Sequence, residues 1–208
     1  VCPAPWGDFR DIYDQAASKL TWRTASYLSL EQQRRRTAKS SLPQEHYELA
    51  EVAHTLHDPD APNDPKRELS VRLIFVHSTS DEKTARQQRE RLLAARGAKL
   101  ATLAERVLDG RHPYTTEARI WEAVHKIFGK TDLKQYLRIE LQRLPKQERD
   151  QLPPPKPGCV RSRFRLVVTR DEAALAQAAR YDGRSLLATT APEVHTTDAL
   201  FSTYKRQI

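Results

Sequence analysis

The chain has 208 residues, and 35 Lys and Arg against 27 Asp and Glu give it a formal net charge of +8. Its 38% hydrophobic content can form a core, but a mean hydropathy of -0.72 and 13 prolines against 6 glycines predict a thin one with long polar helices. This composition disfavours a compact small-molecule enzyme. The excess of cations favours a polyanionic partner, nucleic acid above all, because Lys and Arg gain affinity by releasing counterions from phosphates.

The sequence also bears on location and processing. No apolar run reaches the roughly 18 residues of a membrane span, and the N-terminus lacks the regions of a signal peptide. We therefore expect a cytoplasmic protein with no membrane partner. Cys2 and Cys159 have no CxxC spacing, so neither a disulfide framework nor a zinc ribbon is indicated. The chain contains no methionine and opens on Val-Cys-Pro-Ala-Pro, from which we expect a piece of a longer protein.

Residues 1–45 form the first predicted region. Apolar residues recur at helical spacing over residues 8–20, which predicts an amphipathic helix. Residues 31–39 (EQQRRRTAK) are polar and basic, and they fit either a loop or a short helix. The cluster of Arg34, Arg35 and Arg36 is a candidate DNA contact, with a mobile linker as the equal alternative.

Residues 46–150 form the second predicted region. Two strands, 47–56 and 68–77, flank a turn-rich segment and predict an antiparallel pair. Thr79 and Glu82 fit a capping box that begins a helix over residues 79–108. A second helix over residues 116–128 predicts an antiparallel helical hairpin, and a strand follows at 135–144.

The first of these helices carries a run of basic residues. The candidate contacts to DNA phosphates in this run are Lys83, Arg86, Arg89, Arg91, Arg96 and Lys99. The alternative is a solvated helix face in which these cations alternate with Glu82 and Glu90, which is the commoner role of charged runs on helices.

Residues 151–208 form the third predicted region. The proline-rich segment 151–158 predicts a stiff, extended boundary. Beyond it the pattern predicts a strand at 163–168, a helix at 171–179, a turn at Asp182-Gly183, a strand at 185–189 and a helix from residue 197. This βαβα order is typical of an α/β fold.

The same region resembles the insertion-sequence transposases of the Asp-Asp-Glu (DDE) class. The chain reads AALAQAARYDGRSLLAT over residues 173–189 and LFSTYKRQ over residues 200–207. In that family a similar segment leads into a helix in which a Tyr is followed three residues later by Arg and four further on by the catalytic Glu. Tyr204 matches the Tyr, Gln207 stands at the Arg position, and the Glu would fall just past Ile208. The resemblance makes Tyr204, Lys205 and Arg206 candidate DNA contacts.

The resemblance implies an α/β fold, an incomplete ribonuclease-H-like core with a strand-plus-helical-hairpin insertion. It also implies a homo-oligomeric parent enzyme that cuts and joins DNA at insertion-sequence ends with two Mg²⁺ ions held by three carboxylates. No Asp of this chain follows a strand in the way a ligand of that site would. We therefore assign no catalytic residue and no metal ligand here, and expect the fragment to be inactive. The alternative is a non-catalytic basic module that binds nucleic acid or a partner helix.

Overall fold

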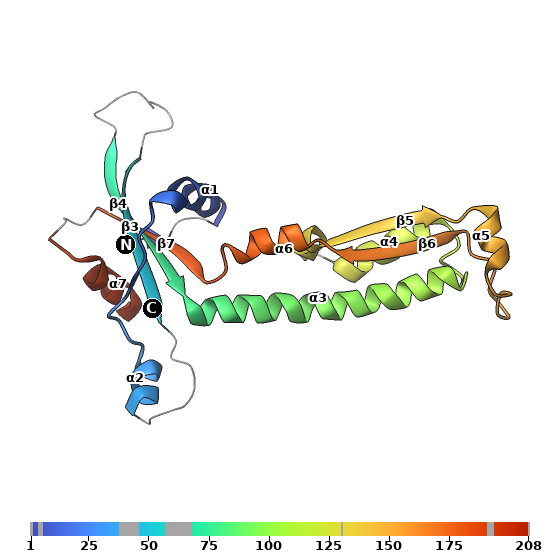
Figure 1. Ribbon diagram of the computed structural model, residues 1–208, viewed down its shortest axis with the longest axis horizontal. Helices are drawn as coiled ribbons and strands as arrows, with labels where there is room; N and C mark the ends of the chain where they lie inside the picture. Colours follow the sequence, from blue (N-terminus) through green and yellow to red (C-terminus); the bar gives the residue numbers. More distant parts are fainter. Residues whose placement is uncertain are drawn as a thin grey trace. The chain divides into compact units, whose positions relative to one another are not determined.

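The computed structural model describes residues 2–3, 6–37, 46–56, 68–129, 131–190 and 194–207 (Figure 1). The fold is mixed α/β, as predicted, and every strand pairing in the described part is antiparallel. The chain forms two compact units: unit 1 is Val1–Ala85 with Tyr181–Ile208, and unit 2 is Arg86–Arg180. The predicted boundaries at 45/46 and 150/151 thus fall inside unit 1 and inside unit 2.

A five-stranded sheet organises unit 1, with the order β1-β7-β4-β3-β2. Its strands are β1 (Cys2–Pro3), β2 (Arg23–Thr24), β3 (Tyr47–Leu56), β4 (Leu69–Ser78) and β7 (Arg184–Thr189). The predicted antiparallel pair is confirmed, because β3 and β4 pair over their whole length, from Tyr47 opposite Ser78 to Leu56 opposite Leu69. β4 lies between β3 and β7 in the sheet, and its residues from Leu73 to Ser78 are buried.

Two helices pack on this sheet through separate cores. α1 (Trp6–Ala16), extended by the 3-10 turn η1 (Ala17–Lys19), packs Phe9 and Tyr13 with Leu73 and Phe75. α7 (Thr197–Arg206) packs Phe201 with a second set of strand residues, Leu49, Ile74, Val76 and Leu187. Neighbouring residues of β4 enter different cores because successive strand side chains point to opposite faces. The basic segment, for which the sequence left a loop and a short helix open, forms the helix α2 (Leu30–Thr37).

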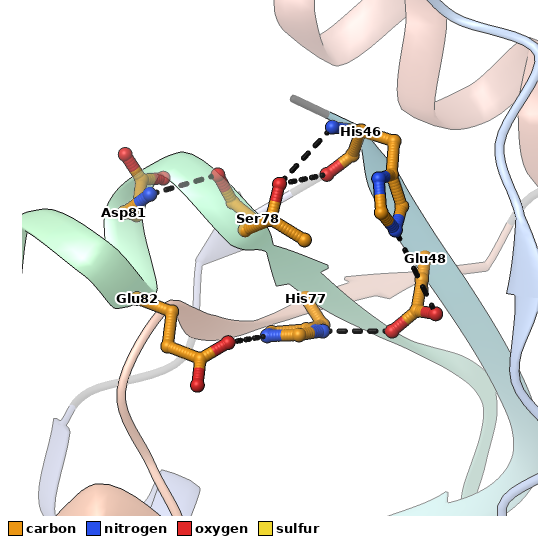
Figure 2. Close-up of polar contacts among 7 residues, drawn as sticks. His46, Glu48, His77, Ser78, Asp81 and Glu82 are labelled. Carbon is orange, nitrogen blue, oxygen red and sulfur yellow. Dashed lines mark hydrogen bonds and ion pairs between the residues drawn. The ribbon is translucent and has the colours of Figure 1, made fainter. Parts of the chain in front are cut away.

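The long helix α3 (Thr79–Leu108) has the predicted bounds, but its predicted capping box is wrong. Ser78 is the residue whose hydroxyl accepts a hydrogen bond from the backbone N–H of Asp81, at 3.2 Å. The Thr79 hydroxyl instead bonds the main chain of His46 across the sheet, and the Glu82 carboxylate bonds the ring of His77 (Figure 2). The end of β4 places Thr79 beside β3, where long-range partners replace the local ones that its sequence offered.

Unit 2 contains the rest of α3 together with α4 (Glu117–Phe128), η3 (Asp132–Tyr136), β5 (Leu137–Arg143), α5 (Lys146–Gln151), β6 (Phe164–Arg170) and α6 (Glu172–Ala179). Both helices of the predicted hairpin contribute to one core, which confirms that they pack together. That core joins α3, α4, α6 and the two-stranded β5–β6 sheet, and its buried residues include Leu93, Leu100, Leu103, Val107, Ile120, Val124, Phe128, Leu137, Leu166 and Leu175.

The predicted βαβα succession is present element by element, but its strands belong to different sheets. β6 pairs with β5, from Leu137 opposite Arg170 to Arg143 opposite Phe164, within unit 2. β7 pairs with β1 and β4 in unit 1. The expectation of one continuous βαβα unit is therefore wrong, because each of these strands finds its hydrogen-bonding partner upstream of residue 151. In the described part of the chain, no helix is both long enough and apolar enough to cross a membrane.

Candidate nucleic-acid interface

The predicted basic residues lie on three different helices, α2, α3 and α7. Arg34 is exposed on α2, whereas the side chains of Arg35 and Arg36 lie outside the described residues. Lys83 and Arg86 are exposed on α3, and Arg89 is half-buried. These positions keep Arg34, Lys83 and Arg86 accessible to a partner in solution.

An ion pair in unit 2 joins Glu90, an acidic residue within the basic stretch of α3, to Arg170 of β6. The hydrogen bond from Arg170 to Glu90, at 2.7 Å, is the main reason why the pKa of Glu90 lies below its ordinary value. The positive charges of Arg89 and Arg86 lower that pKa further. Arg86, Arg89 and Arg170 therefore interact electrostatically with Glu90, which agrees with the solvated-face alternative for this stretch.

The three α7 candidates have different surroundings. Tyr204 is half-buried against the core that contains Phe201. The Nζ atom of Lys205 lies 5.1 Å from the ring centroid of Tyr47 and 5.8 Å from that of Phe201, in cation–π contact within unit 1. Arg206 is exposed. Tyr204 and Lys205 thus help to hold α7 on the sheet.

Ionisable side chains also meet where β4 runs into α3 (Figure 2). Nδ1 of His77 lies 2.8 Å from Oε2 of Glu48, and Nε2 of His77 lies 2.8 Å from Oε2 of Glu82. These two contacts tie β3 and β4 to the first turn of α3. Among the residues described, no group of three His, Cys, Asp or Glu side chains is arranged to hold a metal ion.

A groove between α3 and α4 gathers basic residues, of which Arg96 and Lys99 belong to the basic run that the sequence analysis selected and Arg106 and Lys126 do not. This hollow of about 500 Å³, here called the cationic groove, is lined by Arg96, Lys99 and Arg106 of α3 and by Lys126 of α4. Within the described ranges, none of these four cations forms an ion pair and no acidic residue lines the groove. Four uncompensated cations around one hollow create a positive potential that attracts a polyanion.

Helix geometry explains why the α3 cations converge. At 3.6 residues per turn, Arg96, Lys99 and Arg106 lie within roughly 80° of the helix circumference, and Glu105 lies roughly opposite Arg96. The spacing of these three cations is the feature of the sequence that indicates the groove. By itself it is a weak indication, because the groove also needs α4, whose Ala123 and Ile127 form part of its wall beside Lys126.

Comparisons with known proteins add no relative: no protein-family model, no curated protein and no solved structure matches this chain.

Proposed function

We propose that this chain is a DNA-binding part of a DDE transposase, whose parent cuts and joins DNA at insertion-sequence ends by two-metal phosphoryl transfer. The cationic groove is the observation that carries the DNA-binding part of the proposal. The resemblance over residues 173–189 and 200–207 supplies the enzyme class. Mg²⁺ and homo-oligomerisation belong to the intact parent, and we propose no catalytic residue or metal ligand in this fragment.

We further propose that unit 1 is an incomplete ribonuclease-H-like core and that unit 2 is the insertion. The way the chain leaves and rejoins the sheet supports this arrangement. β7 pairs with β4 although about a hundred residues separate them in sequence, and the backbone N–H of Ser78 donates to the carbonyl of Gly183 at 2.8 Å. The chain thus leaves the sheet after β4 and returns beside the same strand, as an inserted unit requires.

The groove favours backbone phosphates over base edges as its ligand. Its charged side chains are long and flexible, and groups of that kind position a protein on DNA without reading sequence. Each neutralised phosphate contributes a slope of about -0.9 to the dependence of log K on log salt concentration. Engagement of all four cations predicts a slope of roughly -3 to -4.

The test is a fluorescence-anisotropy titration of the full chain with DNA duplexes of unrelated sequence. The salt concentration is varied between about 50 and 200 mM, the range over which phosphate-dominated affinity falls steeply. We expect similar affinities for all sequences and a steep loss of affinity with salt. The triple variant Arg96→Gln, Lys99→Gln, Arg106→Gln should reduce the magnitude of the slope by about 2 to 3. Absent binding, salt-independent binding, or an unchanged slope in the variant would contradict the proposal.

A second triple variant separates local contact from net charge. Arg91→Gln, Lys134→Gln and Arg143→Gln remove the same charge from exposed positions of unit 2 outside the groove. Arg91 lies on α3 about 140° around the helix from Arg96. This control should keep most of the wild-type slope, and an equal loss in both variants would mean that only net charge matters.

One observation favours the alternative of a non-catalytic interaction module. A largely apolar hollow of about 580 Å³ lies between α3 and β6, with Leu93, Ala101 and Leu166 in its lining. A partner helix or strand that occupied it would bury apolar surface, and its binding would be insensitive to salt. The salt titration therefore also discriminates between the two functions.

A further inference from the structure

A second hollow in unit 2, of about 630 Å³, is here called the arginine hollow. Its lining includes Arg149, Arg161, Arg163 and His112, together with the hydroxyl-bearing Tyr114 and Thr115. Tyr114 also borders the cationic groove, so the two hollows meet at this residue. Among the described residues that line the arginine hollow, none is acidic.

The fold builds this hollow from segments far apart in the sequence. The turn after α3 meets the segment before β6 through a hydrogen bond from the Val160 N–H to the Gly110 carbonyl, at 3.0 Å. The Ser162 hydroxyl, buried beside them, donates to the carbonyl of Val107 at 2.7 Å. A Cβ atom at position 110 would lie 1.7 Å from the Val160 oxygen, so glycine is what permits this approach. The walls are therefore held by packed main chain.

The arginines of the hollow are only partly compensated. Arg161 forms an ion pair with Asp150 at 3.0 Å, and Asp150 lies outside the lining. The Nε atom of Arg149 is buried without a hydrogen-bond partner, and Arg163 has no ion pair with a described residue. A buried donor without an acceptor is uncommon in native proteins, since the group has lost its water. An anion in the hollow would balance the positive charge of Arg149 and Arg163.

We propose that the arginine hollow binds the phosphate monoester of a nucleotide. A terminal phosphate offers three oxygens that carry about two negative charges, which suits a hollow lined by several arginines. The volume is in the range of small-ligand sites and exceeds what a lone phosphate needs, so a nucleoside fits beside it. The source is either a free nucleotide or the phosphorylated end of a DNA strand. This goes beyond the proposed function, because the cationic groove binds internal phosphodiesters.

The experiment measures two kinds of ligand on the full chain. Calorimetric titration with deoxyadenosine monophosphate, against deoxyadenosine, tests the free nucleotide. Anisotropy with a duplex that carries either a 5′-phosphate or a 5′-hydroxyl tests the strand end. We expect the phosphorylated member of at least one pair to bind about tenfold tighter, the ratio that one charged hydrogen bond supplies.

Variants assign the effect to the hollow. Arg149→Gln and, separately, Arg163→Gln should each abolish most of the preference for the phosphorylated ligand. Arg143→Gln, an exposed arginine outside the hollow, should leave it unchanged. Arg163 is exposed, so its variant tests the site even where Arg149→Gln does not fold.

Each outcome decides the proposal. A preference for the monophosphate over the nucleoside that Arg163→Gln abolishes supports a free-nucleotide site, and a preference seen only with the phosphorylated duplex supports a strand-end site. No preference in either pair, or a preference that both hollow variants retain, overturns it. Failure of the proposed function has a different signature, since duplexes with a 5′-hydroxyl would then not bind, while the monophosphate or the 5′-phosphorylated duplex still would.

Discussion

At position 183 both the backbone conformation and the surrounding packing require glycine. The φ angle of Gly183 is +67°, and a Cβ atom there would lie 2.4 Å from the Ser78 carbonyl oxygen and 2.5 Å from the backbone nitrogen of Glu82. The Asp182-Gly183 pair predicts a turn from sequence alone. The contact with the junction of β4 and α3 is a second and stronger reason for glycine.

We expect Gly183→Ala to destabilise the protein by roughly 2 to 5 kcal/mol, because strained backbone and a steric clash add. Thermal or urea unfolding measures this change. Gly158→Ala is the matched control, since Gly158 also has a positive φ but open space around its Cβ position, and it should cost about 1 kcal/mol. Equal losses in the two variants would show that the contact with Ser78 and Glu82 is unimportant.

Residue patterns also predicted part of the candidate nucleic-acid interface, but they did not predict the partners of its basic residues. The sequence pattern places the basic residues of α3 on a helix. Their spacing along the helix does not show which of these cations interact with another side chain and which remain available to a ligand. Arg170 comes from β6 to bind Glu90, and Lys205 contacts the rings of Tyr47 and Phe201. Glu90 and Tyr47 lie far in sequence from Arg170 and Lys205, so these two contacts could not be inferred locally, whereas Phe201 lies one helical turn before Lys205.

At the scale of elements, a network around Glu51 connects β3, β4 and α7. Arg72 of β4 donates to both carboxylate oxygens of Glu51, at 2.7 and 2.9 Å, and the Thr197 hydroxyl also donates to Glu51. The Arg72 hydrogen bond is the main reason why the pKa of Glu51 lies below its ordinary value, against an opposing effect of burial. The first turn of α7 is thereby attached to the sheet.

This network predicts a pH dependence. A carboxylate whose pKa is lowered by folding stabilises the protein above the unfolded-state pKa of about 4.3, and that contribution is lost as pH falls through the folded-state pKa. Glu51→Gln should therefore lower stability at neutral pH, by about 0.2 to 1 kcal/mol for a partly exposed pair, and have a smaller effect in acid. Urea unfolding at neutral and acidic pH measures the difference.

Glu140→Gln is the control for this measurement, because Glu140 is exposed on β5 and has no ion pair within the described ranges. It should leave the pH dependence of stability close to that of the wild type. A Glu51→Gln variant with the same loss of stability at both pH values would show that the carboxylate charge is not the stabilising feature.

At the scale of the whole molecule, each unit has its own buried core, although α3 contributes residues to both units. Separate cores allow separate opening, since protection against hydrogen exchange follows the local free energy of unfolding. Leu100 is fully buried in the core of unit 2, and its truncation to alanine should cost about 2 to 5 kcal/mol there.

Native-state hydrogen exchange of Leu100→Ala should therefore show lost protection in α4, β5 and β6 and little change in β3 and β4. Leu108→Ala, on the same helix but 38% exposed, should change protection much less. An equal loss of protection in β3 and β4 would show that the two units unfold as one.

The sequence by itself determined most of the helices and strands of this protein. Periodicity and turn residues act over a few residues, so the bounds of β3 and α3 and the end of α4 at Gly129 could be predicted closely. The net charge and the polar helices follow directly from composition.

Only the tertiary structure decided how these elements combine. Strand pairing depends on which edges meet, so β6 pairs with β5 and β7 with β4, although both strands belong to one predicted βαβα run. The cationic groove and the arginine hollow exist for the same reason: their charges come from segments that only long-range packing brings together, and no local pattern encodes that proximity.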